Sequence, residues 1–161
     1  MNDKLETRTE RPDLRILIPV AFGSHEENGV RYALAEAGRG RRVEAVLACI
    51  GDDDVRADVL RLRTREEIAR FQAAGAAVAM DEVAAPLRAA QVPVSTVFAL
   101  GEVAGELARI AEETGCDEIA IPAGRGGPAC CGGRLDKLRR AGGQVRLRAV
   151  DADGKPQPAV A

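Results

Sequence analysis

Short apolar runs alternate along the chain with longer segments in which apolar residues recur every three or four positions. The runs lie at residues 14–20, 43–50, 92–99, 116–121 and 144–150. The first run, LRILIPV, is rich in branched residues over its whole length. Such a run is typical of a parallel strand that is buried on both faces. The pattern therefore predicts five β-strands.

The longer segments carry the signals of helices. Ser24 with Glu27, and Thr64 with Glu67, have the spacing of a capping box. In that motif the hydroxyl accepts from a backbone N–H three residues on, and the Glu side chain reaches back. Predicted helices occupy residues 24–38, 64–90, 102–114 and 134–141. Strands that alternate with helices predict an α/β fold, an open parallel sheet with helices on both faces.

Composition bounds the domain organisation and the class of partner. A chain of 161 residues with 46% hydrophobic residues fits one domain, and the 2% of aromatic residues favours close packing of helices on a sheet. We expect this domain at residues 14–150, between a flexible N-terminal segment at 1–13 and a flexible C-terminal tail at 151–161. The net charge of -2 argues against nucleic acid as a partner.

Cellular location follows from the apolar content of the segments. The N-terminal residues MNDKLETRTERPD are polar and lack the apolar stretch of a secretory signal. No run approaches the roughly 18 apolar residues of a membrane span. We therefore expect a cytoplasmic protein without a membrane partner.

Three segments, in their order and spacing, carry a resemblance to a known family. They are ILIPVAFGS, GEVAGELARIAEETGCDEIAIP and LDKLRRAGGQVRLRAV. Together they resemble the universal stress protein family over residues 14–150. The resemblance implies a Rossmann-like sheet of five strands in the order 3-2-1-4-5. It also implies homodimers and, in one subgroup, ATP or another adenine nucleotide bound at the carboxyl ends of the strands.

The stretch IPAGRGGPACCGG lies where the ATP-binding relatives hold phosphate. The resemblance aligns Gly124, Gly127, Gly132 and Gly133 with their glycine loop, whose backbone amides approach phosphate oxygens. Only four residues, PACC, separate Gly127 from Gly132 where the family has nine. Gly133 stands where the family has a hydroxyl residue. The loop thus fits an altered nucleotide site, or a βα turn that binds no nucleotide.

The turn after the first strand is the second half of the implied site. The family has an acidic residue there that contacts the nucleoside, followed by Gly-Ser. This chain has Ala21 and Phe22, followed by Gly23 and Ser24. The acidic contact is missing, so the sequence predicts that the protein is not a standard ATP binder.

Cysteines and acidic residues give further candidates for chemistry. Cys130 and Cys131 precede a short predicted helix, whose positive N-terminal end favours a thiolate, so they are either redox thiols or structural, incidental thiols. Cys49 and Cys116 fall near opposite ends of their strands and are expected in the core. The spacing of zinc or redox cysteines is absent.

Two further features remain open between a ligand site and an ordinary surface. His25 is either a ligand contact at the rim of the sheet or a solvated residue at a helix start. The run Asp52–Asp54 is either a cation site or a solvated acidic turn, and no ligand pattern follows it. We predict no metal site and no catalytic residues.

The last strand has its own pattern. Val145, Leu147 and Ala149 alternate with Arg146 and Arg148. A strand with helices on both faces would not alternate in this way, so the pattern predicts an edge strand. Exposed edges can pair with another chain. With the resemblance, this favours a homodimer through residues 144–150; the alternative is that the arginines guard the exposed edge of a monomer.

These features favour a non-catalytic binding or regulatory module of the universal stress type. An enzyme is the alternative, either a weak nucleotide hydrolase or a thiol-dependent activity that uses residues 124–133. Turnover needs oriented acid–base groups, and the sequence offers no such pair. A domain that only makes protein contacts is a third interpretation.

Overall fold

The computed structural model describes residues 10–20, 26–53, 59–123, 136–141 and 143–158. The labelled elements are β1 (Leu14–Pro19), α1 (Glu26–Gly38), β2 (Val43–Gly51), a 3₁₀ turn (Val59–Arg61), α2 (Arg65–Ala89), β3 (Val94–Leu100), α3 (Val103–Glu113), β4 (Glu118–Pro122) and β5 (Arg146–Val150). Residues 136–141 are also helical. Each predicted strand is present, with bounds that differ by a few residues.

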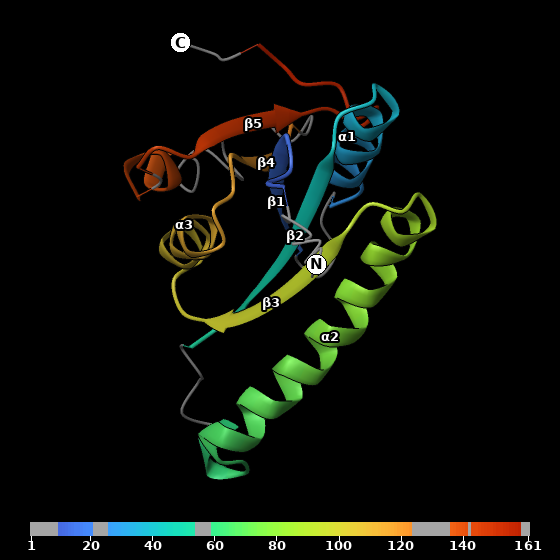
Figure 1. The fold of residues 1–161 in the computed structure, drawn as a ribbon. Helices are drawn as coiled ribbons and strands as arrows, with labels where there is room; N and C mark the ends of the chain where they lie inside the picture. The colour runs from blue at the N-terminus through green and yellow to red at the C-terminus, as the bar shows by residue number, and fades with distance from the viewer. Residues whose placement is uncertain (1–9, 21–25, 54–58, 124–135, 142, 159–161) are drawn as a thin grey trace, which may run out of the picture.

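The strands form one sheet in the order β3-β2-β1-β4-β5. Every neighbouring pair is parallel. In Figure 1, α1 and α2 cover one face of the sheet and α3 covers the other. The predicted α/β fold and its strand order are confirmed, and β5 lies at an edge as its alternating pattern indicated.

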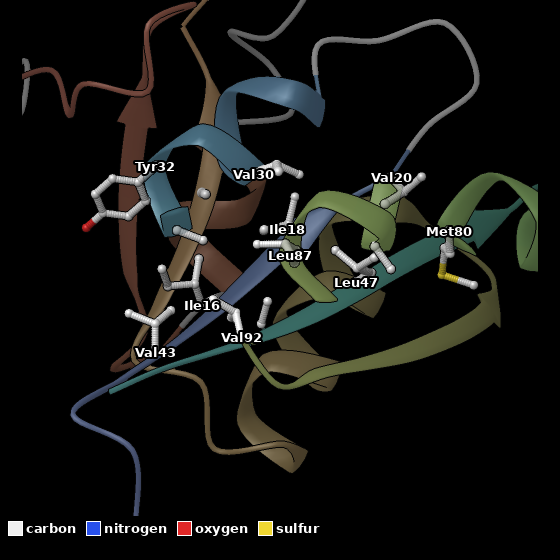
Figure 2. Packing of buried hydrophobic residues seen from close by; sticks show 14 of the residues in the cluster. Ile16, Ile18, Val20, Val30, Tyr32, Val43, Leu47, Met80, Leu87 and Val92 are labelled. Atoms are coloured by element: carbon white, nitrogen blue, oxygen red, sulfur yellow. The ribbon is translucent and has the colours of Figure 1, made fainter. Parts of the chain in front are cut away.

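Each face of the sheet has its own core. Ile16 and Ile18 of β1 pack with α1 and α2, whereas Leu17 between them packs with α3. Figure 2 shows the first of these cores, where side chains from α1 and α2 meet those of β1 and β2. Alternate residues of one strand thus serve opposite faces, which explains why β1 is apolar throughout.

Helix α2 begins at the predicted capping box. Thr64 Oγ1 accepts from the backbone N–H of Glu67, and the Glu67 side chain accepts from the backbone N–H of Thr64. Small and apolar residues along its inner face pack on the sheet; they are Ala76, Met80, Ala84 and Leu87. Phe71 is instead 81% exposed and Val78 63% exposed. The apolar content of α2 is therefore divided between its two faces. Ser24 of the other predicted capping box lies outside the described residues.

Helix α1 lies very close to the sheet at Gly29. A Cβ on Gly29 would lie 2.8 Å from Ile18 Cγ2 and 3.5 Å from Ala120 Cβ. Both neighbours are buried. Since real Cβ atoms do not approach another carbon to 2.8 Å, glycine is required for this helix–strand distance.

A buried carboxylate joins α1 to the two strands at one side of the sheet. Glu118 of β4 is 2% exposed. It accepts from the Tyr32 hydroxyl at 2.7 Å and from Arg148 Nη2 at 2.8 Å. Arg146 Nη2 lies 3.4 Å from the same carboxylate. Burial by itself raises the pKa of Glu118, but the hydrogen bonds from Arg148 and Tyr32 and the charges of both arginines outweigh it and hold the pKa below its usual value.

The C-terminal segment differs from the flexible tail expected at 151–161. Residues 151–157, which we call the hook, turn back toward the end of β5. Val150 and Pro156 form an antiparallel bridge, and the backbone N–H of Gln157 donates to Ala149 O at 2.8 Å. In Figure 1 this segment follows β5 and passes beside α1. The hook is thus packed against the domain.

Among the helices of the described residues, none has the length and apolarity needed to cross a membrane.

Two glycines of α1 provide a matched test of the close approach. Gly29→Ala should lower the free energy of unfolding by about 1 kcal/mol, because overpacking a core costs about 1–3 kcal/mol and the gain of about 1 kcal/mol in helix propensity offsets part of that cost. Gly38→Ala, at the end of the same helix with nothing within 4 Å of the added Cβ, should leave stability unchanged or raise it. Urea unfolding of the two variants measures the difference. Equal stability of both variants would contradict the close approach.

Tyr32 is the only tyrosine of the chain, and there is no tryptophan, so its ionisation can be followed directly by ultraviolet absorbance. Burial, and then the hydrogen bond to Glu118, raises the pKa of Tyr32 from 10.0 to about 12. The stability that this shift contributes is complete below pH 10 and is lost as the pH rises through about 12. We expect the native protein to titrate near pH 12, and the protein in urea near pH 10. A native titration near pH 10 would show that the hydroxyl is neither buried nor bonded to Glu118.

Candidate functional site

The order of the strands identifies a candidate position for a ligand. The chain winds from β1 outward to β3 on one side, then crosses to β4 on the other side of β1. In open parallel sheets, ligands bind outside the carboxyl ends of the strands at this switch point. The switch point here lies between β1, which ends at Pro19, and β4, which ends at Pro122. Residues 21–25 and 124–135 follow these two ends in the sequence.

The residues predicted for the ligand loops lie outside the described part of the chain. These are Ala21, Gly23, His25, Gly124, Gly127, Cys130, Cys131, Gly132 and Gly133, and Asp54 lies outside it as well. Their roles in nucleotide binding or thiol chemistry therefore stay predictions. The described residues show what frames these loops.

The two strand ends are held by backbone hydrogen bonds up to their last described residues. Val20 N donates to Ala48 O at 2.7 Å, which continues the β1–β2 ladder beyond Pro19. Ala123 N donates to Val150 O at 2.6 Å, which does the same for β4 and β5. The last described residues before the two predicted loops are therefore fixed, and both lie at the carboxyl ends of the strands.

Helix α1 is anchored next to the switch point by its first turn. The side chain of Asn28 is buried, and its Nδ2 donates to Val150 O at 3.1 Å. Gly29 follows it in contact with β1. The N-terminal end of α1 carries Glu26 and Glu27. Their negative charge offsets the positive potential that a helix offers to a phosphate at this end.

An acidic hollow of about 220 Å³ lies beside the switch point, at the carboxyl ends of β2 and β3. Its lining residues are Asp52, Asp53, Arg65, Glu66, Ile68, Ala69, Gln72 and Leu100. Gln72 Nε2 lies 3.4 Å from Asp52 O and closes one side. Asp52, Asp53 and Glu66 give this hollow its acidic character, beside Arg65. Within the described ranges, no three His, Cys, Asp or Glu side chains are grouped so that they could hold a metal ion.

Cys49 and Cys116 are core residues, as expected. Cys49 lies near the carboxyl end of β2, and Cys116 precedes the first residue of β4, so the two thiols lie toward opposite ends of the sheet. Both are buried, and burial raises the pKa of each thiol. A thiol with a raised pKa is a poor nucleophile at neutral pH. These two cysteines therefore have a packing role.

Two residues that frame the site were not singled out from the sequence. Gly29 sits inside a helical pattern, and a glycine there is a recognised signal of close packing. Asn28 gave no such signal, because its partner Val150 is 122 residues away in the chain. Together they fix α1 against β1 and β5 near the carboxyl ends of the strands.

Comparison with solved structures finds the same fold in several proteins. A universal stress protein from Lactobacillus plantarum aligns at a TM-score of 0.64 and 16% identity, over 87% of this chain and 99% of that one. A universal stress protein from Archaeoglobus fulgidus in complex with dAMP aligns at 0.58 and 15%, over 87% and 99%. An Arabidopsis thaliana family member with AMP bound aligns at 0.60 and 7%, over 86% and 91%. At these identities the likeness shows the fold.

The search of curated proteins gave no match. The sequence model of one family, described as the universal stress protein family, matches residues 14–130. This match spans β1 to β4 and both halves of the switch point. The chain therefore belongs to the universal stress protein family.

Proposed function

We propose that this protein is a non-catalytic regulatory module that binds a small ligand at the carboxyl ends of β1 and β4. The observation that carries the proposal is the switch point itself, framed by Asn28 and Gly29 and followed by the two predicted ligand loops. Family members of the same fold hold AMP and dAMP. An adenine nucleotide with one phosphate is accordingly the ligand class that we propose.

The protein is proposed not to hold ATP in the usual way of the family. The predicted phosphate loop is short between Gly127 and Gly132 and lacks the hydroxyl residue at Gly133. The described rim adds Glu26 of α1, together with Asp52 and Asp53 beyond β2. Carboxylates near a polyphosphate disfavour it, and the repulsion grows with each added phosphate charge.

The enzyme alternative would use residues 124–133 as a hydrolase loop or as a source of thiolate. Cys49 and Cys116 are not part of that loop, and as buried thiols with raised pKa values they are no source of thiolate themselves. Nucleophilic turnover also needs a base in hydrogen-bond reach of the thiol. We therefore favour binding over catalysis.

Two copies of the chain are proposed to pair through residues 144–150. β5 is the edge strand next to β4, and its outer side offers backbone groups to another strand. Leu147 packs with the apolar core on the α3 face. Arg146 and Arg148 on the other face are both paired with Glu118, whose single negative charge offsets part of the repulsion between the like charges that pairing would bring together.

Isothermal titration with AMP and with ATP tests the ligand class. We expect AMP to bind and ATP to bind at least about tenfold more weakly, which corresponds to about 1.4 kcal/mol of repulsion at the acidic rim. Glu26→Gln should narrow this difference, since it removes one carboxylate from the rim. Glu112→Gln, an exposed position on α3, is the matched control and should change nothing.

Micromolar binding of ATP that is tighter than that of AMP would contradict the proposed preference. Folded protein that gives no heat with either nucleotide would contradict the ligand class. Release of ADP from bound ATP, lost in Cys130→Ser or Cys131→Ser, would favour the enzyme instead.

A further inference from the structure

The outer edge of β5 can be assigned residue by residue. Arg146 N donates to Asp117 O, and Val150 O accepts from Ala123 N, so the backbone groups of residues 146 and 150 face β4. Successive residues of a strand direct these groups to opposite sides. The N–H and C=O groups of Val145, Leu147 and Ala149 therefore face outward, away from the sheet.

The hook forms a hydrogen bond with one of these outward-facing groups, the carbonyl of Ala149. Gln157 N donates to Ala149 O at 2.8 Å, beside the antiparallel bridge of Val150 with Pro156. The hook thus adds a short piece of strand to the carboxyl half of the β5 edge. Leu147 and Val145 lie further along the edge, toward the start of the strand.

The conformation of the hook is fixed by one side chain. The Asp151 carboxylate accepts from the backbone N–H groups of Asp153 and Lys155, each at 2.9 Å, and from Gln157 Nε2 at 3.0 Å. Asp151 N also donates to Lys155 O at 3.0 Å. These bonds close the turn that brings Gln157 back to Ala149. The pKa of Asp151 is below its usual value, and the largest cause is the hydrogen bond from the Lys155 backbone N–H.

The hook is also seated on α1. Gly154 is buried and has a φ of +78°. A Cβ on it would lie 2.7 Å from the backbone carbon of Arg31 and 2.8 Å from Tyr32 N. The Arg31 guanidinium donates to Ala152 O. Only glycine suits both the backbone conformation and the contact, so the turn fits this position on α1 closely.

Symmetric pairing of two β5 strands about Leu147 would use the group that the hook occupies. In an antiparallel pair centred on Leu147, Leu147 lies opposite the partner's Leu147, and Ala149 lies opposite the partner's Val145. The outermost hydrogen bonds on both sides then use Ala149 O. Because Gln157 already donates to that oxygen, the hook and a second copy compete for the same edge.

We propose that the hook is an intramolecular cap on the edge of β5, and that its release is the step that lets two copies of the chain pair. The inference rests on the pairing through residues 144–150 proposed above. A capped edge also protects the single chain from unspecific strand addition.

Sedimentation equilibrium of hook variants tests the proposal. Asp151→Ala removes the carboxylate that closes the hook. A chain that ends at Asp151 lacks every later residue of the hook. Both should dimerise at least about tenfold more tightly than the unmodified chain. Asp153→Ala is the matched control in the same turn: its backbone N–H is kept, so it should behave as the unmodified chain.

A second substitution shows whether the edge is the interface. Leu147→Pro removes an outward N–H and leaves the bonds to β4 in place, since residue 147 faces away from that strand. In the chain that ends at Asp151 this substitution should abolish the dimer. Thermal melting followed by circular dichroism establishes that each variant is folded before its molecular mass from sedimentation equilibrium is interpreted.

The outcomes separate the two proposals. If the unmodified chain is already a dimer that Leu147→Pro dissociates, and loss of the hook leaves its affinity unchanged, the pairing is right and the cap is wrong. If no folded variant dimerises, the pairing itself is wrong. A dimer weakened by loss of the hook would make the hook part of the interface and would also overturn the cap.

Discussion

The short distance between α1 and the sheet is the constraint on which the other features of this protein depend. Gly29 permits the helix to contact Ile18 without a Cβ between them. At that distance Asn28 reaches Val150 O, and the Tyr32 hydroxyl reaches the buried Glu118. The same helix provides the surface on which Gly154 is seated. One helix therefore positions the carboxyl ends of β1 and β4, the outer side of β5 and the hook. A shift of α1 would displace all three.

Features that depend on neighbours in the sequence could be predicted from it. The apolar runs located all five strands. β1 is apolar along its length because it has helices on both faces, whereas β5 at the edge of the sheet alternates. The Thr64–Glu67 capping box located the start of α2, since the motif is complete within four residues. The alternation of Leu147 with Arg146 and Arg148 placed β5 at an edge, because only an edge strand is reached by solvent on that side.

Features that depend on distant partners could not be predicted. Glu118 reads as an ordinary charged residue at a strand start, and its partner Tyr32 is 86 residues away. The sequence of the hook has an Asp and a Gly typical of turns, but its seat on Arg31 is visible only in three dimensions. Phe71 fits an apolar helix pattern equally well inward or outward, and the small residues of α2 decide which face packs on the sheet.

The central claim is that this family member binds its ligand at the carboxyl ends of β1 and β4. Backbone amide NMR spectra recorded during a titration with AMP test it most directly, because each amide reports its own surroundings. If AMP binds there, the amide signals of Val20, Gly29 and Ala123 should move together and saturate with one affinity. Saturating shifts confined to Asp53, Gln72 and Leu100, around the acidic hollow, would contradict it and would place the ligand one strand away from the switch point.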